Sequence, residues 1–242
     1  MSRLHPTGVP LPDGIASTVV ASRAGAPSAL VRDGAVHLAY RDHRAAATVV
    51  ARSEDGVRVE VVAEIRAPAT AGRAALVVTP PGRWRLYLDA GARVELLEAD
   101  SPEGIGTASP ATVLEGAGSP VVQSHGGVWH LWAAVGGDTV RYASPDGLVW
   151  AGQEVALAAG RISSVVDLGD RLVATYDDGE HTAVAVPGDG FGRFRPVDEV
   201  PAAPGLRHLA VLALPGGSYQ LYYEATGPDG VPEIRTEVAP AS

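Results

Sequence analysis

Hydrophobic and polar residues alternate along most of the chain, in short runs that are separated by glycine-containing turns. An alternation with period two is typical of β-strands that bury one face. No segment of about twelve residues shows the 3.6-residue period of an amphipathic helix. The pattern therefore predicts an all-β fold made of many short strands.

The strand pattern repeats five times. An Ala-Gly or Pro-Gly pair precedes a small apolar run at positions 24, 71, 117, 159 and 204, at intervals of 47, 46, 42 and 45 residues. A turn with glycine and then an aromatic-rich strand follow each pair, for example at 84–88 and 129–133. Repeats of this length with four strands each match the blades of a β-propeller. The sequence therefore predicts five four-stranded antiparallel blades.

The two ends of the chain complement each other. The fifth repeat ends near Val238 after its third strand, and a turn at 11–14 followed by a strand stands near the N-terminus. We expect the strand at 15–22 to complete the last blade and close the ring, which removes exposed sheet edges. A β-sandwich or barrel has a similar number of strands, but the repeat interval and the displaced strand favour the propeller. The predicted single domain, 1–242, has blades at about 24–66, 67–116, 117–158, 159–203 and 204–238.

Composition excludes several classes of function. The chain is 46% hydrophobic and 19% charged, with a net charge of -9 and no basic run, which disfavours binding to nucleic acid or to a membrane. It has no cysteine, and all 19 of its basic residues are arginine. Thiolate and Schiff-base chemistry are therefore excluded. No signal peptide, membrane-spanning run, metal motif or cofactor motif is found, so we expect a cytoplasmic protein without cofactor or metal.

Three segments carry a resemblance to a known family: 26–40 (APSALVRDGAVHLAY), 119–132 with its Ser-Pro-Val-Val start, and 144–150 (SPDGLVW). They resemble the five-bladed glycoside hydrolases of the arabinanase and β-xylosidase group (glycoside hydrolase family 43) and the related fructosidases. The resemblance implies catalytic carboxylates at the starts of the inner strands. The matching positions hold Ala26, Arg73, Ser119 and Arg161 instead. Hydrolysis by a pair of carboxyl groups is therefore not expected from these positions.

The same positions predict a basic pocket on the axis. Guanidinium groups bind carboxylates and phosphates, so we expect a small polar or anionic ligand there. The candidate ligand-binding residues are Ser28, Arg73, Ser119, Arg161 and Arg207. In the alternative interpretation, the arginines pair with nearby acids and only hold the blades together.

Candidate acid–base residues lie where the second strand of a blade returns to the face at which the first began. These residues are Asp42, His43, Asp89, Asp177, His208 and Glu224, with Asp178 and His181 close by in sequence. Histidine and carboxyl groups can exchange protons near neutral pH. The alternative is that these residues belong to solvated turns.

Together these features favour a cofactor-free enzyme that acts on a small polar or anionic, sugar-derived substrate by lyase, isomerase or cyclase chemistry. A non-catalytic propeller that binds carbohydrate or another small molecule is one alternative. A glycosidase with displaced carboxylates is the other. The sequence leaves the oligomeric state open.

Overall fold

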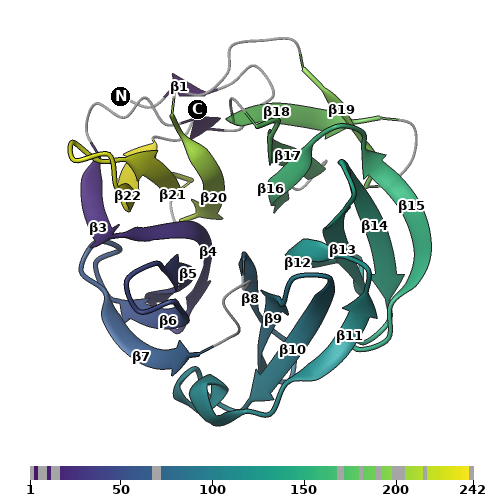
Figure 1. The fold of residues 1–242 in the computed structure, drawn as a ribbon, viewed down its shortest axis with the longest axis horizontal. Helices are drawn as coiled ribbons and strands as arrows, with labels where there is room; N and C mark the ends of the chain where they lie inside the picture. Colours follow the sequence, from purple (N-terminus) through teal and green to yellow (C-terminus); the bar gives the residue numbers. More distant parts are fainter. Residues whose placement is uncertain are drawn as a thin grey trace.

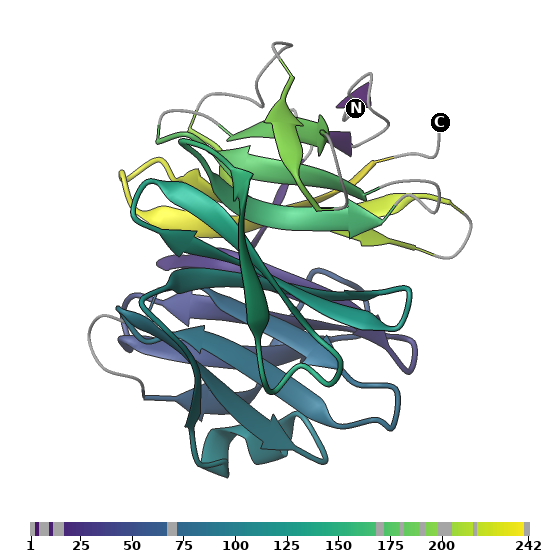
Figure 2. The same cartoon turned by 90° about the vertical axis from the view of Figure 1, so that its right-hand side faces the viewer.

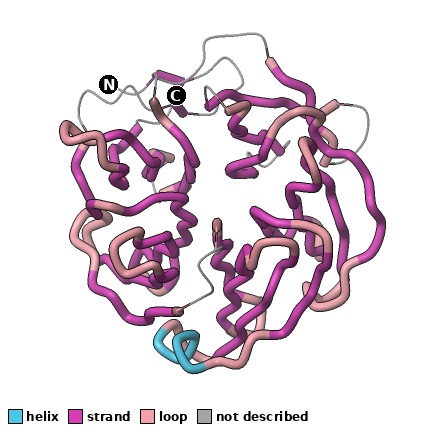
Figure 3. Tube along the Cα trace, in the orientation of Figure 1, coloured by secondary structure: helices cyan, strands magenta, loops and turns pink. Residues whose placement is uncertain are grey.

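The five predicted blades are present as five four-stranded antiparallel sheets around a common centre (Figure 1). The prediction of a five-bladed β-propeller is therefore confirmed. The computed structural model describes residues 3–4, 10–11, 17–66, 72–167, 172–179, 182–188, 192–197, 205–214 and 217–239. Strands dominate these residues, and a short 3₁₀ helix, η1 (Glu103–Thr107), lies in blade 2 (Figure 3).

The strands of blades 1 to 4 follow chain order from the axis outward. Blade 1 holds β4 (Ala24–Arg32), β5 (Ala35–Asp42), β6 (Ala47–Ser53) and β7 (Glu60–Ile65). Blade 2 holds β8 (Ala74–Val78), β9 (Trp84–Asp89), β10 (Arg93–Ala99) and β11 (Ala111–Glu115). Blade 3 holds β12 (Gly118–His125), β13 (Val128–Val135), β14 (Asp138–Ser144) and β15 (Ala151–Leu157). Blade 4 holds β16 (Arg161–Asp167), β17 (Leu172–Asp177), β18 (Thr182–Pro187) and β19 (Phe194–Pro196).

Blade 5 combines both ends of the chain. It contains β20 (Arg207–Ala213), β21 (Tyr219–Thr226), β22 (Pro232–Ala239) and β3 (Thr18–Ser22). The N-terminal strand β3 pairs antiparallel with β22, with Ser22 opposite Glu233 and Thr18 opposite Thr236. The expected closing strand is therefore present. A separate two-stranded pair consists of β1 (Arg3–Leu4) and β2 (Pro10–Leu11).

Hydrophobic side chains fill the spaces between neighbouring blades. Trp84 and Leu86 of blade 2 pack with Ala39 and Val50 of blade 1, and corresponding clusters lie at the other four blade interfaces. The strands run roughly along the axis of the ring (Figure 2), and alternate side chains of one strand point to opposite neighbouring blades. The period-two pattern thus produces two buried faces for each sheet. No helix in the described part of the chain is long and apolar enough to cross a membrane.

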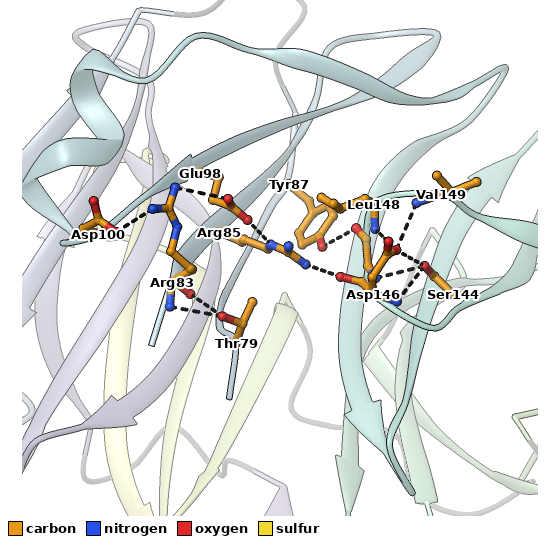
Figure 4. A network of polar contacts seen from close by, with 11 residues as sticks. Thr79, Arg83, Arg85, Tyr87, Glu98, Asp100, Ser144, Asp146, Leu148 and Val149 are labelled. Atoms are coloured by element: carbon orange, nitrogen blue, oxygen red, sulfur yellow. Dashed lines mark hydrogen bonds and ion pairs between the residues drawn. The ribbon is translucent and has the colours of Figure 1, made fainter. Parts of the chain in front are cut away.

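Aromatic side chains of the second strands hold the turns of the next blade. The Tyr87 hydroxyl donates to the Gly147 carbonyl over 2.7 Å, and Trp132 Nε1 donates to the Gly192 carbonyl over 3.1 Å. Around the first of these contacts, Arg85 donates to the Asp146 carbonyl and also pairs with Glu98 (Figure 4). These contacts explain why the repeat carries an aromatic residue in the second strand and glycine in the turn.

Replacing Tyr222 with phenylalanine should lower the free energy of unfolding by about 1–2 kcal/mol. The Tyr222 hydroxyl is buried and donates to the Gly56 carbonyl over 2.7 Å, across the junction of blades 5 and 1. The variant leaves that carbonyl without its partner. Denaturant unfolding measures the loss. Tyr40→Phe is the matched control, because Tyr40 is also buried but its hydroxyl has no hydrogen bond within the described residues. Equal losses in both variants would contradict the prediction.

Candidate functional site

Most predicted site residues gather on one face of the ring, which we call the mouth. It consists of the starts of β4, β8, β12, β16 and β20 and the ends of β5, β9, β17 and β21. Antiparallel pairing brings these ends together, since Arg161 lies opposite Asp177 and Arg207 lies opposite Glu224. The predicted carboxylates and arginines are therefore neighbours in the ring.

Three of the carboxylates link neighbouring blades at the mouth. Glu224 Oε2 accepts the backbone N–H of Ala26 over 3.1 Å. Asp89 Oδ2 accepts the N–H of Ser119 over 2.8 Å and lies 3.3 Å from its Oγ. In each case the carboxylate lies near the end of the second strand of one blade, and the N–H lies near the start of the inner strand of the next. Asp177 makes the corresponding contact at 3.3 Å with the N–H of His208.

The three accepted N–H groups share an unusual backbone conformation. Ala26, Ser119 and His208 have φ values of 53°, 49° and 53°, in the left-handed region that residues with a β-carbon seldom adopt. The strand register shifts at these residues, as expected for a β-bulge. A carboxylate that accepts the exposed N–H offsets part of the backbone strain. The bulges thus explain why acidic residues recur at the mouth.

The Ala-Gly repeat makes room for two of these carboxylates. A β-carbon at Gly25 would overlap the carboxylate of Glu224 and would lie 3.2 Å from His43 Nε2. A β-carbon at Gly118 would lie 2.9 Å from Asp89 Oδ1. In blades 1 and 3, the glycine of the repeated pair therefore has a direct physical cause, the approach of an acid from the preceding blade.

Arg73 spans the axis below the mouth. Its guanidinium is buried and donates to the Ser163 carbonyl of blade 4, on another side of the ring. Burial lowers the pKa of Arg73 to about 10, while the negative charges of Asp177 and Glu224 raise it. The side chain is therefore still cationic at neutral pH and balances part of the acidic mouth.

The channel that Arg73 lines is narrow. The axial cavity has a volume of about 100 Å³ and is bounded mainly by small and aliphatic residues of the inner strands. Pockets for small ligands usually measure ~300–1,000 Å³. We therefore place the candidate site at the mouth, above Arg73, rather than inside the channel.

The His208–Asp177 pair is the arrangement at the mouth most suited to proton transfer. His208 Nδ1 lies 3.1 Å from Asp177 Oδ2, and the side chain of His208 is 32% exposed. The Thr182 hydroxyl donates to Asp177 Oδ1 over 2.6 Å. Burial favours the neutral acid, but the nearby charge of His208, the Thr182 hydroxyl and the charge of Arg73 together hold the pKa of Asp177 below its usual value. A carboxylate at Nδ1 orients the ring and leaves Nε2 available as a base.

The other predicted ligand-binding residues differ in their environments. Arg161 and Arg207 are exposed at the mouth. The hydroxyl of Ser28 accepts the N–H of Leu76 over 3.1 Å, so it ties blade 1 to blade 2. Ser119 is bound to Asp89, as described above.

The remaining acid–base candidates form no pair like His208–Asp177 within the described residues. Asp42 Oδ1 accepts the N–H groups of Arg44 and Ala45 over 2.7 and 3.0 Å, and so caps the turn that follows β5. His43 is exposed close to Glu224. Asp178 is exposed, and His181 lies outside the described residues. No group of three His, Asp or Glu side chains in the described ranges could hold a metal ion.

One residue of the mouth was missed from the sequence. Arg41 occupies the place in blade 1 that Asp89, Asp177 and Glu224 occupy in blades 2, 4 and 5. Its backbone lies opposite Gly25 at the start of the inner strand. An alignment of the second strands on their fully buried leucine would have found it, because the residue three positions after Leu38 is Arg41, as Asp89 follows Leu86 and Glu224 follows Leu221.

The structure resembles solved structures of glycoside hydrolases. A GH43_1 enzyme from Xanthomonas citri in complex with xylotriose superposes with a TM-score of 0.75 at 15% identity, over 94% of this chain and 90% of that chain. RS223-β-xylosidase gives a TM-score of 0.71 at 11% identity, over 92% and 94%. The chain has the fold of the five-bladed glycoside hydrolase propellers.

A third solved structure extends the comparison. A glycoside hydrolase of unassigned activity from Bacteroides ovatus superposes with a TM-score of 0.66 at 12% identity, over 93% of this chain and 95% of that chain. No protein-family model matches the chain, and no curated protein matches its sequence. The similarity to these solved structures confirms, for the propeller fold, the resemblance seen in the sequence.

Proposed function

We propose that the chain is a carbohydrate-active enzyme that binds a sugar-derived substrate at the mouth and transfers protons through His208. The observation that carries this proposal is the contact of 3.1 Å between His208 Nδ1 and Asp177 Oδ2. The similarity to glycoside hydrolase propellers supports a carbohydrate as the substrate class. The reaction requires no cofactor, because the pair supplies both a base and the group that orients it.

Proton transfer fits this mouth better than hydrolysis by two carboxyl groups. Asp89 and Glu224 already accept backbone N–H groups of the next blade, which gives them a structural role. His208 Nε2 can take a proton from a substrate carbon or hydroxyl and return it to another atom or to a departing oxygen. Such a cycle is balanced without an added reactant and is typical of isomerases and lyases. The exposed Arg161 and Arg207 supply positive charge nearby.

A paired substitution tests the role of His208. Neutral and acidic oligosaccharides would be incubated with the protein and followed by NMR, with nitrophenyl glycosides as a separate assay for hydrolysis. His208→Asn should lower kcat by about 10²–10⁴-fold on any substrate that is converted, since a general base contributes about that factor. His125→Asn is the matched control, because His125 Nδ1 also contacts an aspartate, Asp167 Oδ2, over 2.8 Å, at the far ends of β12 and β16.

The control variant should retain full activity. Turnover by His208→Asn at the rate of the unmodified protein would contradict the proposed role. Conversion of nitrophenyl glycosides that survives His208→Asn but is lost in Asp89→Asn would point to a glycosidase with displaced carboxylates.

A non-catalytic carbohydrate-binding propeller is the second candidate. The observation that favours it is the use of Asp89 and Glu224 as links between blades. In that case sugars would bind at the mouth with measurable affinity, and no panel member would be converted. Calorimetry beside the NMR assay distinguishes the two candidates, because the enzyme both binds and converts its substrate.

A further inference from the structure

Arg41 faces blade 2 at the mouth. On the same side of β5, the His37 ring contacts Trp84 of blade 2 with ring centres 4.6 Å apart, and Ala39 packs with Leu76. Since alternate residues of a strand share one side, the Arg41 side chain belongs to this interface. In the corresponding positions of three other blades, a carboxylate accepts a backbone N–H.

The Arg41 guanidinium has no acidic partner among the described residues. The residue is only 8% exposed, and its Nη1 is buried without a hydrogen bond. Burial lowers the pKa of Arg41, and the one charge that raises it is that of Asp42. Asp42 directs Oδ1 to the N–H groups of its own turn, and residues 67–71, which precede blade 2 in sequence, contain neither Asp nor Glu.

A second unpartnered polar group lies beside Arg41 in the described part of the chain. Thr48 of β6 is directly opposite Arg41 in the strand register, is 1% exposed, and has a buried Oγ1 without a hydrogen bond. The corresponding threonines of blades 3 and 4 are both satisfied. Thr139 donates to the Gly160 carbonyl over 2.7 Å, and Thr182 Oγ1 has two acceptors within reach, Asp177 Oδ1 at 2.6 Å and the Leu206 carbonyl at 2.8 Å.

Two buried donors thus stand at paired positions of neighbouring strands, and neither has an acceptor from the described residues. Nearly all buried polar groups in proteins are hydrogen-bonded, and an uncompensated buried charge is strongly unfavourable. A guanidinium and a hydroxyl together present several N–H and O–H donors, which match the oxygens of a carboxylate or phosphate. An oxyanion at this point would satisfy both groups.

We propose that Arg41 and Thr48 form an anion-binding subsite at the mouth, which receives the oxyanion group of a sugar acid or sugar phosphate. The inference rests on the proposed function for the location of the sugar, and it narrows the substrate class to anionic sugars. Because the two side chains are almost fully buried, they contact only the oxyanion group and not the sugar ring. Neutral sugars would lack the group that this subsite binds.

Binding measurements test the subsite. Calorimetry with glucuronate, glucose 6-phosphate, glucose and inorganic phosphate should show at least one anionic sugar binding tenfold or more tightly than glucose. The order of the affinities identifies the oxyanion group that the subsite binds. Preference for glucuronate indicates a carboxylate, and preference for glucose 6-phosphate indicates a phosphate. Arg41→Met and Thr48→Val should each reduce this preference at least tenfold. Arg44→Gln is the control, because Arg44 is exposed in the turn next to Arg41 and should leave the preference unchanged.

A second measurement does not depend on the probe. Without ligand, Arg41→Met should have a Tm equal to or above that of the unmodified protein, because it removes an uncompensated buried charge. A large fall in Tm would show that Arg41 has a structural role and would overturn the proposal. Equal or weaker binding of both anionic sugars relative to glucose, or binding of inorganic phosphate alone, would also overturn it.

The outcomes separate this subsite from the proposed enzyme. His208→Asn should lower kcat by about 10²–10⁴-fold and leave the preference for the anionic sugar intact. If the preference depends on Arg41 and Thr48 but no sugar is converted, the subsite is supported and the enzymatic function is not. If a neutral sugar is converted through His208 and no anionic preference exists, the enzyme is supported and the subsite is overturned.

Discussion

Replacing Trp132 with alanine is expected to lower the free energy of unfolding by about 3–5 kcal/mol, as for other buried aromatic residues. Trp132 is fully buried between blades 3 and 4, where its ring centre lies 6.1 Å from that of Phe194. The alanine variant leaves a cavity and also leaves the Gly192 carbonyl without the N–H that contacts it at 3.1 Å. The loss exceeds that of Tyr222→Phe because an entire ring is removed.

Denaturant unfolding measures this loss as a shift of the midpoint at an unchanged slope. The stability of Trp132→Phe should lie between that of the alanine variant and that of the unmodified protein. Phenylalanine keeps most of the buried volume of tryptophan, but it cannot make the hydrogen bond. Val149→Ala is the control at an exposed site, since Val149 is 73% exposed, and it should change stability by less than about 0.5 kcal/mol. A loss below about 1 kcal/mol for Trp132→Ala would contradict tight packing at this interface.

Replacing Asp177 with alanine is expected to lower the free energy of unfolding by about 3–5 kcal/mol, the range for breaking a buried charge pair. The variant removes one acceptor of the Thr182 hydroxyl, the acceptor of the His208 N–H, and the negative charge that lies 3.1 Å from His208 Nδ1. It also removes one of the negative charges that stabilise the Arg73 guanidinium. Asp177→Asn should lose less, because the amide oxygen still accepts a hydrogen bond. Asp33→Ala should change stability by less than about 1 kcal/mol, since the Asp33 side chain is exposed beside Arg32.

Acidic pH provides a second measurement on Asp177. Its pKa in the folded protein lies below the usual value, which is about 3.9 in the unfolded chain. The stabilisation from its charge is therefore complete above the unfolded pKa and is lost as the pH falls through the folded pKa. The difference in stability between the protein and Asp177→Asn should be constant above about pH 5 and should shrink below about pH 4. A difference that stays constant down to about pH 2 would contradict this contribution.

The fold was predictable because its signals are local and repeated. Period-two alternation and turn glycines recur in the five blades, and in blades 2, 3 and 5 a second-strand aromatic residue holds a turn of the next blade, as the contact of Tyr87 with Gly147 shows. The closing strand followed from counting, since four strands per blade left one strand missing at the C-terminal end. Because the fold is repeated, the same sequence pattern can be recognised several times along the chain.

The site was predictable only in outline. The sequence placed Asp89, Asp177, His208 and Glu224 on one face, but it could not show that the acids accept N–H groups from bulges. Those bulges occur at Ala26, Ser119 and His208, which carry β-carbons and give no sign of a positive φ.

The arginines show a second limit of the sequence. Arg73 and Arg161 occupy matching positions, yet one is buried across the axis and the other is exposed. Arg41 was missed because Asp42 follows it directly, and the side of a strand on which a residue lies changes with a shift of one position. Long-range packing, rather than the local sequence pattern, decides which of these arginines are buried and which side of the strand each occupies.

The shared construction of blade 5 affects how the chain reaches its final state. Residues 18–22 and 233–236 pair across almost the whole length of the chain, so this pairing has a high contact order and forms after the local hairpins. Until it forms, β22 presents an unpaired edge to solvent. The equivalent strand of a second copy could fill that edge as well as the chain's own strand does. Exchange of residues 18–22 between two copies is therefore the route by which this ring would form a domain-swapped dimer at high concentration.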